Sequence, residues 1–98
     1  MYSNMNLLKH QEELLFSLKM AVKRHRTSEV IYKSEWLGDL PYGAYHWVEV
    51  DGEEIKPTSP DSLHNDLTLL AKIGALKVVK EVQLNDEDNH VYYELAAG

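Results

Sequence analysis

The chain begins with a helical pattern of apolar residues. From about residue 4 to residue 26 an apolar stripe recurs at 3.6-residue spacing, while charged side chains occupy the other side. Ser3 and Asn4 are candidate N-caps, and the basic residues Lys23 to Arg26 suit the negative end of the helix dipole. The pattern predicts one long amphipathic helix, whose stripe consists of Leu7, Leu8, Leu14, Leu15, Leu18, Ala21 and Val22.

Two large apolar residues lie off this stripe. Phe16 and Met20 are one turn apart on the opposite side of the helix, where water would surround them in a monomer. An exposed apolar pair of this kind favours a partner. We therefore expect a homodimer through the N-terminal helix, with Phe16 and Met20 in its interface.

The next segment predicts a short strand and a short helix. Residues Thr27–Lys33 are rich in β-branched and aromatic side chains, which favours a strand, although Val30, Ile31 and Ser34 also fit one face of a helix. Ser34 is then positioned to cap a short helix over Glu35–Leu40, which ends before Pro41.

A β-hairpin is predicted between Ala44 and Lys56. Its turn is Asp51-Gly52, a pair that accepts the positive φ angles of a two-residue type I′ turn. The turn fixes the register, so that Val48 and Ile55 should face the core, while Glu49 and Glu54 face solvent. The predicted pairs are Val50 with Glu53, Glu49 with Glu54, Val48 with Ile55 and Trp47 with Lys56.

A second helix and two strands complete the pattern. Ser59 is a candidate N-cap, Pro60 suits the first helical position, and Gly74 is placed to end the helix in the left-handed conformation. Two strands should follow at Leu76–Leu84 and His90–Leu95, joined by an exposed acidic loop. The expected buried residues are Leu63, Leu67, Leu70, Ala71 and Ile73 in the helix, Leu76, Val78, Val82 and Leu84 in the first strand, and Val91, Tyr93 and Leu95 in the second.

Composition narrows the class of protein. The chain has 98 residues, which predicts a single domain over residues 1–98 with one modest core. It has no cysteine, no pattern typical of a secretory leader, and no apolar run near the roughly 20 residues of a membrane span. We expect a cytoplasmic protein without disulfides and without a membrane partner.

Chemistry-bearing residues show no catalytic pattern. The five histidines, His10, His25, His46, His64 and His90, have no i,i+4 pair and no partner at metal-ligand spacing. No nucleophile elbow, Gly-rich phosphate loop or paired-carboxylate motif accompanies the Ser, His and Asp residues. The sequence therefore predicts a protein that is not an enzyme and that uses no metal or cofactor.

The C-terminal part resembles a known family. The segment from Ser59 to Leu95 is similar to the recognition helix and wing of winged-helix transcription regulators of the DeoR and ArsR types. Leu67, Leu70, Gly74 and Leu76 stand where those families place packing residues, and Asp66-Leu67 matches the Asp-Leu of DeoR-type helices. The resemblance implies an α+β winged-helix-like fold, made of a long N-terminal helix, a short strand and helix, a β-hairpin, a recognition-type helix and a two-stranded wing.

The same resemblance implies a DNA-binding regulator. The residues expected to contact DNA from the recognition-type helix are Ser62, His64, Asn65, Thr68 and Lys72. Lys23, Arg24 and Arg26, with Lys9 and Lys19 on the same helix, form the basic cluster expected to contact phosphate. The alternative interpretation, which the cluster taken alone favours, is a stabilising interaction of these charges with the helix dipole.

Charge supports an alternative function. The net charge is −6, the expected wing tip is Asp86-Glu87-Asp88, and His64 and Asn65 stand where DeoR-type helices usually carry arginine. The acidic tip and the negative net charge repel a phosphate backbone, and the helix lacks the cations that would offset this repulsion. The alternative hypothesis is an acidic protein-interaction module on the same scaffold, which binds a basic protein partner and uses Tyr45 and Trp47 as exposed aromatic anchors.

Overall fold

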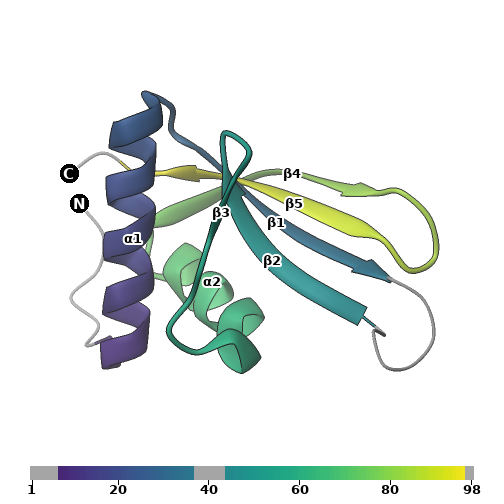
Figure 1. Ribbon diagram of the computed structural model, residues 1–98, viewed down its shortest axis with the longest axis horizontal. Coiled ribbons are helices and arrows are strands. Elements are labelled where there is room, and N and C mark those ends of the chain that lie inside the picture. The colour runs from purple at the N-terminus through teal and green to yellow at the C-terminus, as the bar shows by residue number, and fades with distance from the viewer. Residues whose placement is uncertain (1–6, 37–43, 97–98) are drawn as a thin grey trace.

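The computed structural model describes residues 7–36 and 44–96 as an α+β fold in two layers (Figure 1). One layer is a five-stranded antiparallel sheet with the strand order β3-β2-β1-β5-β4. The other layer contains the helices, which pack on one face of that sheet. The elements are α1 (Lys9–His25), β1 (Glu29–Trp36), β2 (Ala44–Val50), β3 (Glu53–Ile55), a 3-10 turn η1 (Pro60–Ser62), α2 (Leu63–Lys72), β4 (Leu76–Gln83) and β5 (Asn89–Leu95).

The helix α1 begins later than the apolar pattern predicts. Leu8 is the N-cap residue, and its backbone N–H donates to Gln11 Oε1 over 2.9 Å. Leu7 and Leu8 therefore precede the helix, whereas the predicted caps Ser3 and Asn4 lie outside the described residues. The helix ends at Arg26, which adopts a left-handed conformation with φ 54° and donates its N–H to the carbonyl of Lys23.

The hairpin confirms its predicted register. Val50 pairs with Glu53, Glu49 with Glu54, and Val48 with Ile55, while Asp51 and Gly52 take φ angles of 50° and 84°. These angles match the type I′ turn that Asp-Gly predicts. The strand β3 stops at Ile55, so the predicted Trp47–Lys56 pair is not part of the ladder.

The predicted strand and short helix after α1 need correction. The strand β1 runs from Glu29 to Trp36, so Glu35 and Trp36 belong to it and not to a helix. Pairing with β2 explains the extension, because Glu35 and Trp36 lie opposite Tyr45 and Ala44, whereas the pairing with β5 ends at Ser34. The remainder of the predicted helix lies outside the described residues.

The second helix confirms most of its predicted stripe and its end, whereas Ala71 is half-buried and the α-helix begins three residues later than predicted, with Ser62 as its N-cap. Pro60 is the first residue of η1 with Ser59 as its N-cap, and α2 continues from Leu63. Leu63, Leu67 and Leu70 are buried, and Gly74 has φ 91°, which favours glycine at the helix end.

The core lies between the helices and one face of the sheet. Side chains that alternate along a strand point to opposite faces, and one set of β-strand residues meets the apolar stripes of α1 and α2. The buried sheet residues include Val30, Tyr32, Val48, Val50, Ile55, Val91, Tyr93 and Leu95, and α1 contributes Leu14, Leu15, Leu18 and Ala21.

The strand β4 departs from its predicted burial. Its register shifts between Val78 and Lys80, where a β-bulge interrupts the alternation. Leu76 is buried, whereas Val78 and Leu84 are 50% and 53% exposed and Val82 is half-buried. The prediction that these residues share a buried face was wrong at Val78 and Leu84, because β4 is a bulged edge strand that ends at Gln83.

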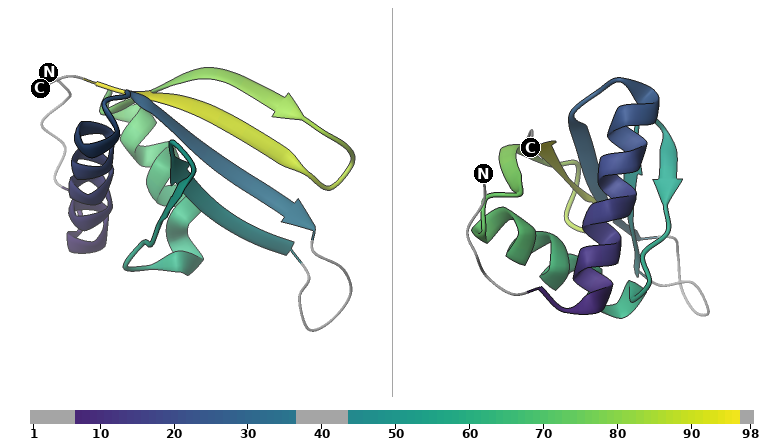
Figure 2. Two further views of the ribbon diagram at one scale, coloured as in Figure 1. Left: turned by 45° about the horizontal axis from the view of Figure 1, so that its top comes forward. Right: turned by 90° about the vertical axis from the view of Figure 1, so that its left-hand side faces the viewer.

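The helices cover only part of the sheet. Figure 2 shows both helices grouped near one end, while β1, β2, β5 and β4 project beyond them. The molecule measures 41 × 25 × 22 Å along its principal axes. The strands predicted to form a separate wing, β4 and β5, are two neighbours in the larger sheet. Within the described residues, no helix is both long and apolar enough to cross a membrane.

Candidate functional site

On the sheet face opposite the described helices, two neighbouring aromatic rings lie tilted against each other. Tyr45 and Trp47 alternate along β2 with the buried Val48, so their side chains lie on the face opposite the helices. Their ring centroids are 5.1 Å apart at an interplanar angle of 31°. Tyr45 is 43% exposed, and Trp47 is half-buried. The two rings form an aromatic pair beside one edge of the sheet.

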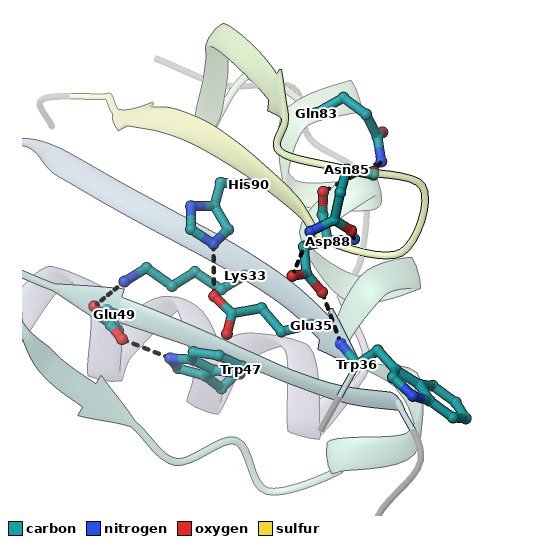
Figure 3. Close-up of polar contacts among 9 residues, drawn as sticks. All are labelled: Lys33, Glu35, Trp36, Trp47, Glu49, Gln83, Asn85, Asp88 and His90. Atoms are coloured by element: carbon teal, nitrogen blue, oxygen red, sulfur yellow. Dashed lines mark hydrogen bonds and ion pairs between the residues drawn. The ribbon is translucent and has the colours of Figure 1, made fainter. Parts of the chain in front are cut away.

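Two carboxylates hold these rings. The Trp47 indole donates from Nε1 to Glu49 Oε2 over 2.6 Å, and the Tyr45 hydroxyl donates to Glu54 Oε2 over 3.2 Å. Lys33 Nζ lies 3.0 Å from the other oxygen of Glu49, so that carboxylate bridges an indole and an ammonium group (Figure 3). The rings are thus oriented before any partner arrives.

Glu49 is held in its charged form. Burial would raise its pKa, but the hydrogen bonds from Trp47 and Lys33, together with the charge of Lys33, lower the pKa below the ordinary value of 4.5. The predicted outward orientation of Glu49 and Glu54 is correct, yet Glu49 is half-buried because these two side chains cover it. Glu49 therefore remains anionic at neutral pH.

A hollow lies next to the aromatic pair. It has a volume of ≈ 280 Å³ and is lined by Tyr45, His46, Trp47, Glu54, Lys56, Pro57 and Pro60. It forms because β3 ends at Ile55, while β2 continues back to Ala44. Within the described residues, Tyr45 to Trp47 therefore have a neighbouring strand, β1, on one side only. An unpaired strand edge can accept another extended chain.

A second polar network lies farther along the same face. His90 Nε2 is 2.9 Å from Glu35 Oε2, which links β5 to β1 (Figure 3). The backbone N–H of Trp36 donates to Asp88 Oδ1 over 2.8 Å. This backbone bond and the Asn85 side chain lower the pKa of Asp88.

The acidic tip is an ordered turn. Asn85 Oδ1 accepts hydrogen bonds from the backbone N–H groups of Glu87 and Asp88, both over 2.8 Å. The Gln83 side chain donates to the carbonyls of Asn85 and Asp88. These local bonds account for the run of polar residues, because Asn side chains commonly satisfy turn backbone. Within residues 7–36 and 44–96, no group of three His, Cys, Asp or Glu residues is placed to hold a metal ion.

The residues predicted for the recognition helix lie together on and beside α2. His64, Asn65, Thr68 and Lys72 are exposed, and the Thr68 hydroxyl donates to the His64 carbonyl over 2.9 Å. The His64 ring lies 5.7 Å from the ring of Tyr32. Ser62 is half-buried and is bonded to Ser59 and Asp66, so its hydroxyl is occupied within the protein.

The predicted basic cluster is partly neutralised by acidic residues of the hairpin. Arg24 donates two hydrogen bonds to Glu53, over 2.7 and 2.8 Å, and His25 Nε2 lies 2.6 Å from the same carboxylate. Asp51 is a further acid beside His25, at 3.4 Å. Hydrogen bonds from Arg24 and His25 lower the pKa of Glu53. Lys23 and Arg26 remain exposed at this end of α1.

The Phe16–Met20 pair is exposed, as the sequence predicts. Phe16 is 64% and Met20 45% exposed in the monomer. A hollow of ≈ 330 Å³ lies beside them, between α1 and the edge strand β3, and Arg24 and Ile55 are among its lining residues.

A buried polar cluster between the helices was not identified from the sequence. Asp66 is 3% exposed and accepts hydrogen bonds from Gln11 Nε2 over 3.0 Å and from Ser62 Oγ over 2.9 Å, while His10 Nε2 lies 3.2 Å away. The available signal was the position of Asp66 next to Leu67 and Leu70, on the buried side of the helix.

This cluster joins α1 to α2 and does not form a nucleophilic site. The carboxylate stands between Ser62 and His10, so the hydroxyl and the imidazole each contact Asp66. An activated serine requires the hydroxyl to bond to the imidazole, with the acid behind it. The arrangement therefore acts as a polar clasp between two helices.

Comparisons with protein-family models, with curated proteins and with solved structures found no match for this chain.

Proposed function

We propose that this protein is a protein-interaction module that binds an extended, basic segment of a partner alongside Tyr45–Trp47 of β2. The observation that carries the proposal is the half-paired edge of β2, which lies beside a hollow and carries a preoriented aromatic pair. A strand added in line with β3 would gain backbone hydrogen bonds from β2 and side-chain contacts in the hollow.

The charges favour a basic segment. Glu49 and Glu54 fix the two aromatic rings, and the whole chain carries a net charge of −6. A lysine or arginine side chain gains from nearby carboxylates and from the face of an aromatic ring. Lys56 also lines the hollow, and its ammonium group is 4.0 Å from Glu54. The basic partner residues are therefore expected over Tyr45 and Trp47 and not beside Lys56.

DNA binding through α2 has weaker support. The exposed face of α2 offers Lys72 as its cationic group beside His64, Asn65 and Thr68, and Arg24 is bonded to Glu53. Phosphate contacts dominate the affinity of DNA-binding proteins, so a face with so few cations gains little from them. DNA binding is therefore the competing function, and the experiment below distinguishes it from peptide binding.

The test is a selection of random linear peptides displayed on phage, followed by binding assays with the selected peptides. A Trp36→Phe variant leaves Trp47 as the single tryptophan of the chain, so its fluorescence reports directly on the aromatic pair. We expect enriched peptides to be basic, to change the Trp47 emission and to shift the backbone amides of Tyr45–Trp47 in NMR spectra.

Matched variants locate the site. Tyr45→Ala and Trp47→Ala should each weaken the selected peptides, whereas Trp36→Ala, which removes another exposed aromatic residue of the sheet, should not. Enriched peptides without basic residues, or amide shifts elsewhere, would refute the proposal. Salt-dependent binding of a DNA duplex that is lost in Lys72→Ala would instead support the DNA-binding function.

A further inference from the structure

The exposed side of α1 carries a self-complementary pattern. Glu13, Phe16, Met20 and Lys23 are spaced by three, four and three residues, which is the spacing of the contact positions in a coiled coil. All four side chains are exposed, and the core residues Leu14 and Leu18 point the other way, into the protein. One seam therefore has an acidic end, an apolar centre and a basic end.

We propose that this seam binds a second copy of the same chain, with the two α1 helices antiparallel about a two-fold axis. In an antiparallel pair centred on residue 18, Phe16 of one protomer contacts Met20 of its partner. Glu13 then lies opposite the partner's Lys23, and this contact occurs twice because the interface is symmetric. The inference concerns α1 and does not rest on the function proposed for the sheet.

The charges at the two ends of the seam also select the direction of the pair. Glu13 and Lys23 are opposite in sign, so an antiparallel pair brings each of them against its complement. A parallel pair would place Glu13 against Glu13 and Lys23 against Lys23, which is unfavourable. Charge complementarity thus selects the antiparallel arrangement.

Space beside α1 accommodates the partner helix. Figure 2, in its right-hand view, shows α1 in front of the sheet with its outer side uncovered by the other described elements. The hollow between α1 and β3, of ≈ 330 Å³, adjoins a second of ≈ 530 Å³ that is lined by Glu12, Glu13, Phe16, Ser17 and Thr58. Phe16 lines both hollows, so the large side chains of the partner can enter on either side of it.

The size of the contact indicates a reversible dimer. The helix has 17 residues and is about 25 Å long at 1.5 Å per residue. Such a contact is smaller than the roughly 800 Å² per partner of a standard stable interface. We therefore expect a monomer–dimer equilibrium that depends on protein concentration.

Sedimentation equilibrium of the full chain over a range of concentrations tests the inference. Phe16→Ser should raise the dimer dissociation constant by about tenfold. Glu13→Lys and Lys23→Glu should each raise it by roughly threefold to tenfold, because each replaces two attractive contacts with two repulsive ones. Glu87→Lys and Lys72→Glu make the same charge changes at exposed positions outside α1 and should leave the constant unchanged.

Two combinations establish the register. The double variant with Glu13→Lys and Lys23→Glu restores both opposite-charge contacts and should recover the dimer. A mixture of the two single variants should form a heterodimer more readily than either variant pairs with itself. A chain that stays monomeric at all concentrations, or a dimer that is indifferent to these charge changes, would overturn the inference.

Discussion

Replacement of Asp66 by alanine should destabilise the fold strongly, because the carboxylate is the shared acceptor of the clasp between α1 and α2. Its three neighbours would be affected differently. Ser62 can redirect its single hydroxyl hydrogen to the carbonyl or hydroxyl oxygen of Ser59, and the His10 side chain is 28% exposed and can bond to water. The Gln11 amide is 7% exposed, so its Nε2 donor would lose its partner in a buried position.

The expected loss of unfolding free energy comes mainly from the Gln11 donor, which would be left without an acceptor. A buried donor without an acceptor costs about 1–3 kcal/mol, and the lost hydrogen bonds to a charged acceptor add to that cost. We expect Asp66→Ala to lower the free energy of unfolding by about 2–4 kcal/mol, a large share of the 5–15 kcal/mol typical of a domain. Asp66→Asn, which retains one acceptor oxygen, should cost about 1 kcal/mol.

The assay is urea unfolding followed by far-UV circular dichroism, with the slope of the transition compared between variants. Asp86→Ala serves as the control, because it removes an exposed carboxylate at the tip of the β4–β5 hairpin. If Asp66→Ala remained within about 0.5 kcal/mol of the unmodified protein, as surface substitutions usually do, the assignment of a clasp would be wrong.

Three further predictions test other parts of the fold. Gly52→Ala should lower the unfolding free energy by about 1–2 kcal/mol because Gly52 has a φ of +84°; no atom lies within 4 Å of an added Cβ, so steric contact does not contribute. Gly52→Asn should cost less, because Asn tolerates a positive φ better than Ala, and equal losses would contradict the role of φ. Leu67→Ala, at a fully buried position, should cost about 2–5 kcal/mol by chemical denaturation, whereas the exposed Val79→Ala should change stability by less than about 0.5 kcal/mol. Because the pKa of Glu49 is lowered in the folded state, its ionisation stabilises the fold fully above the ordinary value of 4.5, and this stabilisation is lost as the pH falls through the folded-state pKa. Glu49→Gln should therefore lose less unfolding free energy on acidification than the unmodified protein does. Identical pH profiles of the two proteins would contradict the proposed bonding of Glu49.

Local sequence signals predicted the elements whose geometry depends on adjacent residues. Asp51-Gly52 determined the hairpin register, and the spacing of Leu63, Leu67 and Leu70 identified the buried side of α2. Gly74 marked the helix end correctly. In each case the physical cause, a positive φ or a 3.6-residue period, acts within a few residues.

Long-range pairing explains what the sequence analysis missed. The strand β1 extends to Trp36 because β2 pairs with it up to that residue, and Ser34, which pairs with strands on both sides, was mistaken for a helix cap. The bulge at Val78 and Lys80 leaves no periodic signal, so β4 appeared half-buried.

The contacts of the candidate site were missed for the same reason, because their residues are far apart in the sequence. Arg24 meets Glu53 across 29 residues, His90 meets Glu35 across 55, and His10 meets Asp66 across 56. Tyr45 and Trp47 were selected correctly as exposed aromatic residues of the hairpin, but the hollow beside them depends on where β3 ends.

The unequal cover of the sheet has a consequence for hydrogen exchange. The strands near α1 and α2 are anchored by the core, whereas no described helix covers their projecting ends, which are the C-terminal ends of β1 and β4 and the N-terminal end of β5. Backbone amides with few buried apolar neighbours open by local fluctuations that leave the rest of the domain folded. The projecting ends should therefore exchange with solvent in a faster cooperative unit than Val30, Val48 or Leu67. Tyr45 pairs with Glu35 next to the projecting end of β1, so a strand bound to β2 there would slow exchange in the faster unit.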